Sequence, residues 1–283
     1  MKNRIFFIIL IFSSVSFFSF SENKTGFNLF GSGETFRLNV VTDSVLFGAG
    51  LTLNGTSFII DKTSAQKTPS FPYNIDDVNA FDRKLAYLYS GTLHKISTVS
   101  CVTSLLTPAL LAFTTDTSEW LTIAVMYTET FLLTNGIKEL TKTLVFRPRP
   151  YMYFDGYPQK KIDEGDWEDS FFSGHTAHAF SGAAFTSFVF AKYYPDSPWR
   201  YAVTAGTFAL AAATGIMRVA GGNHFVTDVL VGAAVGTACG FLVPWIHTKI
   251  GGTKSGSPAN STTGFSSIAP QITPYSVGFS VKL

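Results

Sequence analysis

Charge is scarce in this sequence. Only 14% of its 283 residues are Asp, Glu, Lys or Arg, whereas soluble domains carry about 25%. Intrinsic disorder needs low hydrophobicity and high net charge, so this composition excludes a disordered chain. The formal net charge is only +2. Without a basic excess to neutralise phosphates along a strand, the chain is not expected to bind nucleic acid.

Cysteine is almost absent as well. Cys101 and Cys239 both lie in apolar runs, and two isolated cysteines form neither a metal motif nor a disulfide framework. We interpret both as small buried apolar side chains. The sequence also lacks a cluster of acidic residues with metal-ligand spacing, so we expect no metal and no other cofactor.

Apolar residues, by contrast, are abundant. They make up 46% of the chain, with 28 Phe and a mean hydropathy of +0.23. The long apolar runs are rich in Ala, Gly, Ser and Thr, which suits close helix packing in a bilayer. Several runs are shorter than the ~20 residues that a span needs, so buried helices of a soluble protein are the alternative. The candidate spans are residues 96–115, 120–137, 176–191, 201–217 and 229–248.

The first residues have the features of an export signal. Residues 1–21 combine a basic start, an apolar centre and a small-x-small exit at Ser19 and Ser21, as a signal peptide does. An uncleaved first membrane anchor is the alternative, and both imply export in a bacterium. Residues 22–94 form an N-terminal region, partly interfacial, in which the glycine-interrupted run 44–60 is interfacial or partly extended.

The last residues differ from the rest of the chain. Residues 251–283 form a polar linker followed by a strand-like tail, because 276–283 alternate polar and apolar side chains. A lone strand is not stable, so we expect it to pair with residues 36–41, which alternate in the same way.

Three polar clusters lie at ends of the apolar runs. In the first, Lys142, Arg147 and Arg149 stand at the end of a helix that Pro148 and Pro150 terminate. Three cations without a nearby acid indicate an anion site, and a basic patch at a lipid surface is the alternative.

The second cluster opens the next apolar helix. Ser173 is a good N-cap, so the free N–H groups of Gly174 and His175 are available to a phosphate. His175 is placed to transfer a proton. An ordinary helix cap with a surface histidine is the alternative, and His178, one turn later, is expected to be structural.

The third cluster lies between two apolar helices. Arg218 ends one helix, and His224 and Asp228 are four residues apart on one face of the next. Asp228 can accept the Nδ1–H of His224 and leave Nε2 free as a nucleophile. A capping pair is the alternative. Because two antiparallel helices separate this cluster from the second, all three clusters can face one pocket.

In these motifs the sequence resembles the type 2 phosphatidic acid phosphatase (PAP2) family, which shares its fold with class A acid phosphatases and vanadium haloperoxidases. Lys142 to Arg149-Pro150 fits the pattern Lys-x6-Arg-Pro. Ser173-Gly174-His175 fits Pro-Ser-Gly-His, with Phe172 in place of the proline. Arg218, His224 and Asp228 fit Ser-Arg-x5-His-x3-Asp, with Met217 in place of the serine.

This resemblance implies an all-α, multi-pass helical bundle with a PAP2-like core at residues 95–250, beside the short β element of the tail and the N-terminal region. It also implies roles in a reaction. His224 attacks phosphorus and forms a phosphohistidine, Asp228 orients it, and His175 protonates the leaving oxygen. Arg147 is expected to be an outer contact. The implied phosphate-binding residues are Lys142, Arg149, Ser173, Gly174 and Arg218.

The expected function is metal-independent hydrolysis of phosphate monoesters or pyrophosphates of membrane lipids. We expect a multi-pass protein of the bacterial inner membrane with its active site facing the periplasm, provided that residues 44–60 do not span. The expected partners are a lipid phosphate substrate and membrane lipids, and the oligomeric state is left open. The alternatives are a soluble-type periplasmic acid phosphatase, a vanadium haloperoxidase holding vanadate in the same pocket, or a non-catalytic envelope protein.

Overall fold

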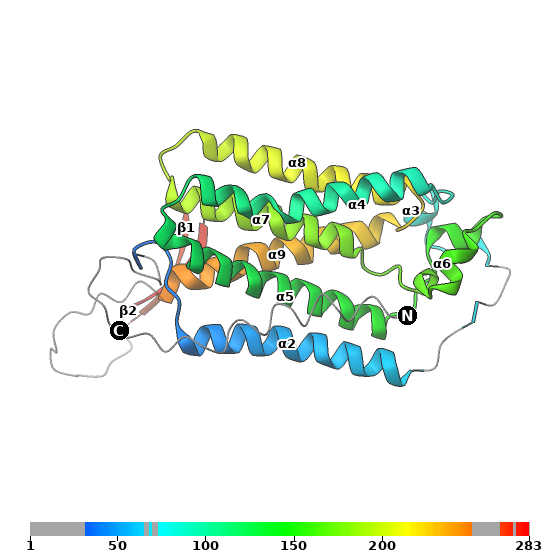
Figure 1. Cartoon of the computed structure of the whole chain (residues 1–283), viewed down its shortest axis with the longest axis horizontal. Coiled ribbons are helices and arrows are strands. Elements are labelled where there is room, and N and C mark those ends of the chain that lie inside the picture. Colours follow the sequence, from blue (N-terminus) through cyan, green and yellow to red (C-terminus); the bar gives the residue numbers. More distant parts are fainter. Residues whose placement is uncertain (1–31, 65–67, 70–72, 251–266, 274–275, 283) are drawn as a thin grey trace.

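The computed structural model of the protein describes residues 32–64, 68–69, 73–250, 267–273 and 276–282. The proposed signal segment 1–21 and most of the linker lie outside these residues. Long helices dominate (Figure 1), which confirms the all-α prediction. They are α2 (Val40–Thr63), α4 (Gly91–Leu105), α5 (Trp120–Leu144), α7 (Gly174–Tyr193), α8 (Trp199–Ala220) and α9 (Val226–Ile250).

The shorter elements lie in the connections. α3 (Ala80–Arg83) precedes α4, and α6 (Gln159–Asp163) lies between α5 and α7. The long helices lie side by side and alternate in direction, so α3 and α6 are at the same end of the bundle (Figure 1). We call this the α6 end. The remaining helical turns are Ile75–Asp77, Thr107–Phe113, Thr117–Glu119, Pro150–Tyr153 and Asp166–Glu168.

Helix α7 is the central helix of the bundle and packs against α4, α5, α8 and α9. Ser173 is its N-cap, as predicted, and its side chain accepts a hydrogen bond from the N–H of Thr176. Small residues such as Ala177, Ser181 and Gly182 fill its buried surface. Small side chains let neighbouring backbones approach closely, which explains how one helix accommodates so many partners.

The contact between α7 and α9 is especially close. A Cβ atom placed on Gly236 would lie 2.1 Å from the carbonyl oxygen of Ala177, a distance that real atoms do not reach. Gly232 and Gly240, one turn away on either side, meet the carbonyls of Ser173 and Ser181 in the same way. The glycines every four residues in α9 therefore determine how near the two helices lie.

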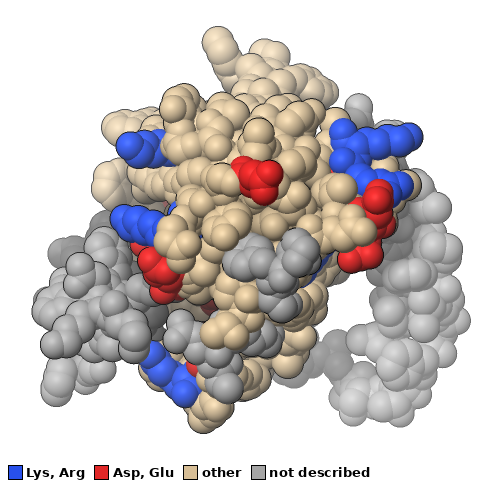
Figure 2. All heavy atoms as spheres, turned by 90° about the vertical axis from the view of Figure 1, so that its right-hand side faces the viewer, with Lys and Arg blue, Asp and Glu red and all other residues tan. Residues whose placement is uncertain are grey.

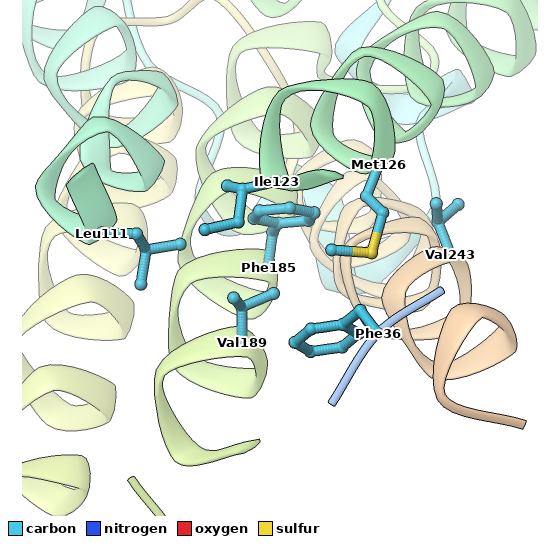
Figure 3. Packing of buried hydrophobic residues seen from close by; sticks show 7 residues of the cluster. All are labelled: Phe36, Leu111, Ile123, Met126, Phe185, Val189 and Val243. Atoms are coloured by element: carbon cyan, nitrogen blue, oxygen red, sulfur yellow. The ribbon is translucent and has the colours of Figure 1, made fainter. Parts of the chain in front are cut away.

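An apolar core fills the bundle at the end opposite to α6 (Figure 3). Phe36, in the segment before α2, is fully buried and packs edge-on against Tyr193 at the end of α7. It joins residues from α5, α7 and α9. The cluster consists of Phe36, Leu111, Ile123, Met126, Phe185, Val189 and Val243.

Two expectations, for residues 44–60 and for the tail, need correction. Of the two alternatives for residues 44–60, interfacial or partly extended, the extended one is wrong, because α2 is a continuous helix that Asn39 caps and that packs along α5. The tail does form a strand, β2 (Ser276–Lys282), but its partner is β1 (Ser267–Thr273) in an antiparallel pair and not residues 36–41. Val40 and Val41 belong to α2, and a strand neighbouring in sequence pairs at a lower entropic cost.

Three helical segments are long and apolar enough to cross a membrane: Gly91–Phe113, Trp199–Ala220 and Val226–Thr248. They correspond to three of the five predicted spans and identify the chain as a membrane protein. The other two predicted spans are helices of 25 and 20 residues, α5 and α7, but they do not belong to this set. α7 is central and polar groups line it, which explains its lower hydropathy. α2 is also outside the set.

The α7–α9 contact leads to a stability prediction. Gly236→Ala should lower the free energy of unfolding by about 1–3 kcal/mol, because the new methyl group meets a backbone carbonyl that has no room to move. The matched control is Gly48→Ala on α2, where nothing lies within 4 Å. That change should be neutral or stabilising, by up to about 1 kcal/mol, through helix propensity. Unfolding of the two detergent-solubilised variants measures the difference, and equal losses would contradict the packing argument.

Candidate active site

The three predicted clusters come together at the α6 end of the bundle. Ser173, Gly174 and His175 begin α7, Arg218 lies near the end of α8, and Asp228 is in the first turn of α9. Figure 2 looks onto this end, where most of the described surface is uncharged. The site cations are buried beneath it, with Arg149 only 3% and Arg218 only 1% exposed. The convergence predicted from helix counting is confirmed.

His224 lies at the centre of the site with a defined orientation. Its Nδ1 lies 2.7 Å from the carbonyl oxygen of Ser170, and its Nε2 lies 3.2 Å from Nη1 of Arg149. A carbonyl only accepts and a guanidinium only donates. Nδ1 therefore carries the proton, and Nε2 has a free lone pair directed at a cation.

Asp228 acts on His224 less directly than predicted. Its Oδ2 is 3.6 Å from Nδ1 of the histidine, so the nearer acceptor is the Ser170 carbonyl. The same Oδ2 accepts hydrogen bonds from the Ser170 hydroxyl at 2.6 Å and from the Phe225 N–H at 2.9 Å. Asp228 therefore fixes the two backbone segments that hold the imidazole.

Arg149 occupies the position expected of the main anion-binding group. Its side chain donates to the carbonyl of Asp166 at 2.6 Å and to the carboxylate of the same residue at 2.7 Å. It also donates to the carbonyl of Asn223 at 3.0 Å. These contacts fix the guanidinium plane beside His224 before any ligand arrives, which reduces the entropic cost of binding one.

Arg147 has acidic and aromatic partners around Asp228, a position compatible with the predicted outer contact. It pairs with the carboxylates of Asp228 and Asp82, the latter at 2.6 Å, and donates to the Thr227 hydroxyl. Its guanidinium also lies over the ring of Phe225. Arg147 therefore joins the α3 segment to the start of α9.

On the other side of the site, Arg218 and His175 meet residues of α4. Nη1 of Arg218 is 3.0 Å from Nδ1 of His94, while its Nε has no hydrogen-bond partner. Nε2 of His175 is 3.2 Å from the Thr98 hydroxyl, which donates its own proton to the His94 carbonyl. The Thr98 oxygen is then left to accept, so His175 carries its proton on Nε2.

The remaining predicted residues have partners of their own. Lys142 Nζ donates to the Asp169 carbonyl at 2.9 Å, and the Ser173 hydroxyl is 2.9 Å from that of Thr176. At Gly174 a Cβ would lie 2.5 Å from Cδ of Lys138, so a larger residue there would displace that lysine side chain. Lys142 and Ser173 must exchange these contacts to reach a ligand.

Burial and neighbouring cations set the charges of the site. Burial lowers the pKa of His224 well below its usual value, and Arg149, Arg218 and Lys142 lower it further. Burial and Arg218 do the same for the pKa of His175. Both imidazoles are therefore neutral at pH 7, while the guanidinium groups keep their charge. For Asp166, burial raises the pKa, but Arg149 and Lys161 outweigh it and hold the pKa below its usual range.

Four residues of this site were not predicted: Asp82, His94, Asp166 and Ser170. Each acts on a predicted residue that is distant in sequence, so no local spacing marks it. His94 is one of five histidines in the chain and lies near the start of an apolar run. Asp82 lies in the short helix α3, and its N–H donates to the side chain of the N-cap residue Asn79. Ser170 contributes its carbonyl, which no sequence pattern reveals.

The geometry suits a bound oxyanion. A neutral imidazole with a free Nε2 lone pair faces a wholly buried guanidinium, and further cations and a helix N-terminus surround them. The profile of the PAP2 superfamily matches residues 123–251. This part of the chain belongs to the PAP2 superfamily. All three predicted clusters, from Lys142 to Asp228, lie within the matched residues.

The chain is also similar to individual proteins of known name or structure. A lipid A 1-phosphatase of Porphyromonas gingivalis is 40% identical over 87 residues, which cover 31% of this chain but only 18% of that protein. The crystal structure of Aquifex aeolicus LpxE matches 62% of this chain and 96% of its own, with 23% identity and a TM-score of 0.41. The crystal structure of a transmembrane PAP2 type phosphatidylglycerolphosphate phosphatase from Bacillus subtilis matches 74% of this chain and 96% of its own, with 23% identity and a TM-score of 0.44.

The Arg149–Asp166 pair leads to a pH-dependent prediction. Asp166→Asn should cost about 3 kcal/mol at pH 7, because it leaves a buried guanidinium without its carboxylate. A lowered carboxyl pKa contributes stability above the unfolded value of 3.8, and that stability is lost as the pH falls toward the folded value. The difference in unfolding free energy between the Asp166→Asn variant and the wild type should therefore become smaller below about pH 4.

Thermal unfolding in detergent between pH 7 and pH 3 measures this gap. Asp163→Asn is the matched control, since Asp163 is an exposed acid of the same loop that only accepts from Gln159. It should change stability by less than about 0.5 kcal/mol. A gap that widens on acidification would contradict the assignment.

Proposed function

We propose that this protein is a phosphatase that hydrolyses phosphate monoesters or pyrophosphates of membrane lipids. The observation that carries the proposal is the Nε2 lone pair of His224, held 3.2 Å from the buried guanidinium of Arg149 within a PAP2 domain. The apolar, membrane-capable helices around the site favour a lipid over a soluble substrate. The name of the Porphyromonas gingivalis relative supports lipid phosphates as the class.

The reaction proceeds in two steps on the residues described. Nε2 of His224 attacks phosphorus, so that a P–N bond forms while the bond to the lipid oxygen breaks. His175 gives a proton to that oxygen. Water then attacks the phosphohistidine with His175 as base, which releases phosphate and restores His224. The Nδ1–H···O=C bond to Ser170 holds the ring orientation throughout.

Binding of the substrate prepares His175 for its role. In the free protein, burial and the charge of Arg218 lower its pKa. A bound phosphate brings negative charge that offsets Arg218 and Arg149 and so favours the imidazolium form. The proton donor is thus formed where and when a phosphate is present.

No metal is needed in this scheme. Arg149, Arg218 and Lys142 supply the positive charge that the transition state requires, in a water-excluded site where each charge acts strongly. Lys142 reaches the phosphate by leaving the Asp169 carbonyl. The second candidate function on this fold is that of a haloperoxidase, which would hold vanadate in the same pocket and oxidise a halide.

We further propose that the protein lies in a bacterial inner membrane with its active site facing the periplasm. The signal-like residues 1–21 support export of the chain. Lys192 in the last turn of α7 and Arg200 near the start of α8 flank the α7–α8 turn, which lies at the end of the bundle opposite to α6 (Figure 1). The positive-inside rule favours the cytoplasm for a turn flanked by cations. The condition is that residues 44–60, which lie in α2, do not cross the membrane, and the labelling experiment below tests it.

The nucleophile assignment is tested by His224→Ala. Phosphate release should fall by at least ~10³-fold, because the covalent step is lost while the cations remain. The assay is phosphate release from phosphatidate, phosphatidylglycerophosphate, polyprenyl pyrophosphate, lipid A and a soluble monoester, with detergent-purified protein. His178→Gln serves as control, since His178 contacts Asn135 and Phe131 outside the site, and it should keep most of the activity.

Unchanged turnover in the His224 variant would refute this assignment, and release from the soluble monoester alone would identify an acid phosphatase. Bromide oxidation with vanadate and no phosphate release would identify a haloperoxidase. The wild type should remain active in EDTA at the assay temperature, and a strict need for added metal would contradict the mechanism.

The orientation is tested with single cysteines. Lys160 lies on α6 and is 86% exposed, and Asp196 is exposed in the turn between α7 and α8 at the opposite end. Cys101 and Cys239 are buried and give no background. In intact spheroplasts an impermeant maleimide should label Lys160→Cys and not Asp196→Cys. Labelling of Asp196→Cys and not of Lys160→Cys would mean that α2 also crosses the membrane after an exported N-terminus. The active site would then face the cytoplasm.

A further inference from the structure

A second polar cluster lies far from the phosphatase site, toward the other end of the bundle. It consists of Asp43 in the first turn of α2, Glu129 in α5 and His247 in the last turns of α9. One ligand atom from each residue lies within 4.8 Å of the other two. Asp228 and His247 are separated by about 28 Å along the axis of α9, so the cluster plays no part in the phosphoryl chemistry.

The orientation of His247 directs a lone pair into this cluster. Its Nδ1 lies 2.9 Å from the carbonyl of Val243, which only accepts, so Nδ1 carries the proton. Nε2 then faces Oδ1 of Asp43 at 3.1 Å and Oε2 of Glu129 at 3.4 Å. Three atoms with lone pairs thus converge on one point.

Glu129 supplies a second, independent observation. Its side chain is wholly buried, and neither carboxylate oxygen has a hydrogen-bond partner. Within the described residues neither Glu129 nor Asp43 pairs with a Lys or Arg. An isolated buried carboxylate costs several kcal/mol, so this cluster must hold either a proton or a bound cation.

We propose that Asp43, Glu129 and His247 bind a divalent transition-metal ion of the zinc or manganese class. One imidazole nitrogen and two carboxylate oxygens are a donor set that such ions accept. The observed separations of 3.1 and 3.4 Å resemble the edge of a tetrahedron with bonds of about 2.1 Å, which is ~3.4 Å. The N–H···O=C bond from His247 to Val243 is the outer contact that metal-binding histidines usually make.

The proposed ion has a structural role. It joins α2 to α5 and α9 beside the Phe36 core, at the end of the bundle opposite to the catalytic residues. α2 also makes polar contacts with α5, where Asn54 accepts a hydrogen bond from Asn135 and donates one to the Leu132 carbonyl. Loss of the metal should therefore loosen α2 and lower the melting temperature while phosphate release at low temperature persists.

The test measures metal bound by the full-length protein in detergent. The protein is stripped with EDTA, incubated with Zn²⁺ or Mn²⁺ in separate samples, freed of excess ion by gel filtration and examined by elemental mass spectrometry. We expect about one ion per chain for at least one of the two metals, and a higher melting temperature on its addition. Glu129→Gln and His247→Gln should each reduce the bound metal by at least ~10-fold.

Matched controls separate this site from others. Glu119→Gln changes a buried acid of the same end that already accepts from Tyr193 and Ser32, and it should retain the metal. His224→Ala should also retain it, which excludes binding at the catalytic histidine. If the buried variants do not fold, Asp43→Asn at the partly exposed position gives the same readout. No metal on the wild type, or full metal on the Glu129, His247 and Asp43 variants, would overturn the proposal and leave a protonated histidine as the buried cation.

Discussion

The close contact between α7 and α9 is the constraint on which the rest of the molecule depends. Gly232, Gly236 and Gly240 let the α9 backbone lie directly on the carbonyls of α7. Because both helices begin at the α6 end, the contact brings their first turns together, and the Ser173 N–H donates to the Asp228 carbonyl. The N-terminus of α7, the proposed anion-binding element, and His224, the proposed nucleophile, are thus fixed relative to each other by packing.

Scarcity of charge makes each buried ionisable group informative. At the α6 end Arg149 lies beside His224, and carbonyl oxygens and Asp166 hold its guanidinium group in place. Toward the opposite end two carboxylates lie beside one imidazole. The proposed anion site and the proposed cation site thus lie at the two ends of one bundle, with the apolar helices between them.

Sequence reasoning recovered the helices and the main site residues because both depend on local rules. Apolar runs gave the helices, Ser173 was recognisable as a cap, and helix parity placed three clusters on one side. Sequence reasoning missed the residues whose partners are distant in the chain. Asp82 lies far from Arg147 in sequence and Ser170 far from His224, and Ser170 acts through its backbone. The pairing of the tail failed because alternation identifies a strand but not its neighbour.

By itself the sequence predicted the type of chemistry, since its three spaced motifs resemble those of the PAP2 family. The same resemblance, together with the apolar runs, predicted the all-helical fold. Only the tertiary structure decided which atom carries each proton, because the tautomer of His224 depends on Ser170 and Arg149. The tertiary structure also decided that Asp43, Glu129 and His247 meet. Asp43 and His247 are 204 residues apart in sequence, and helix packing brings them together.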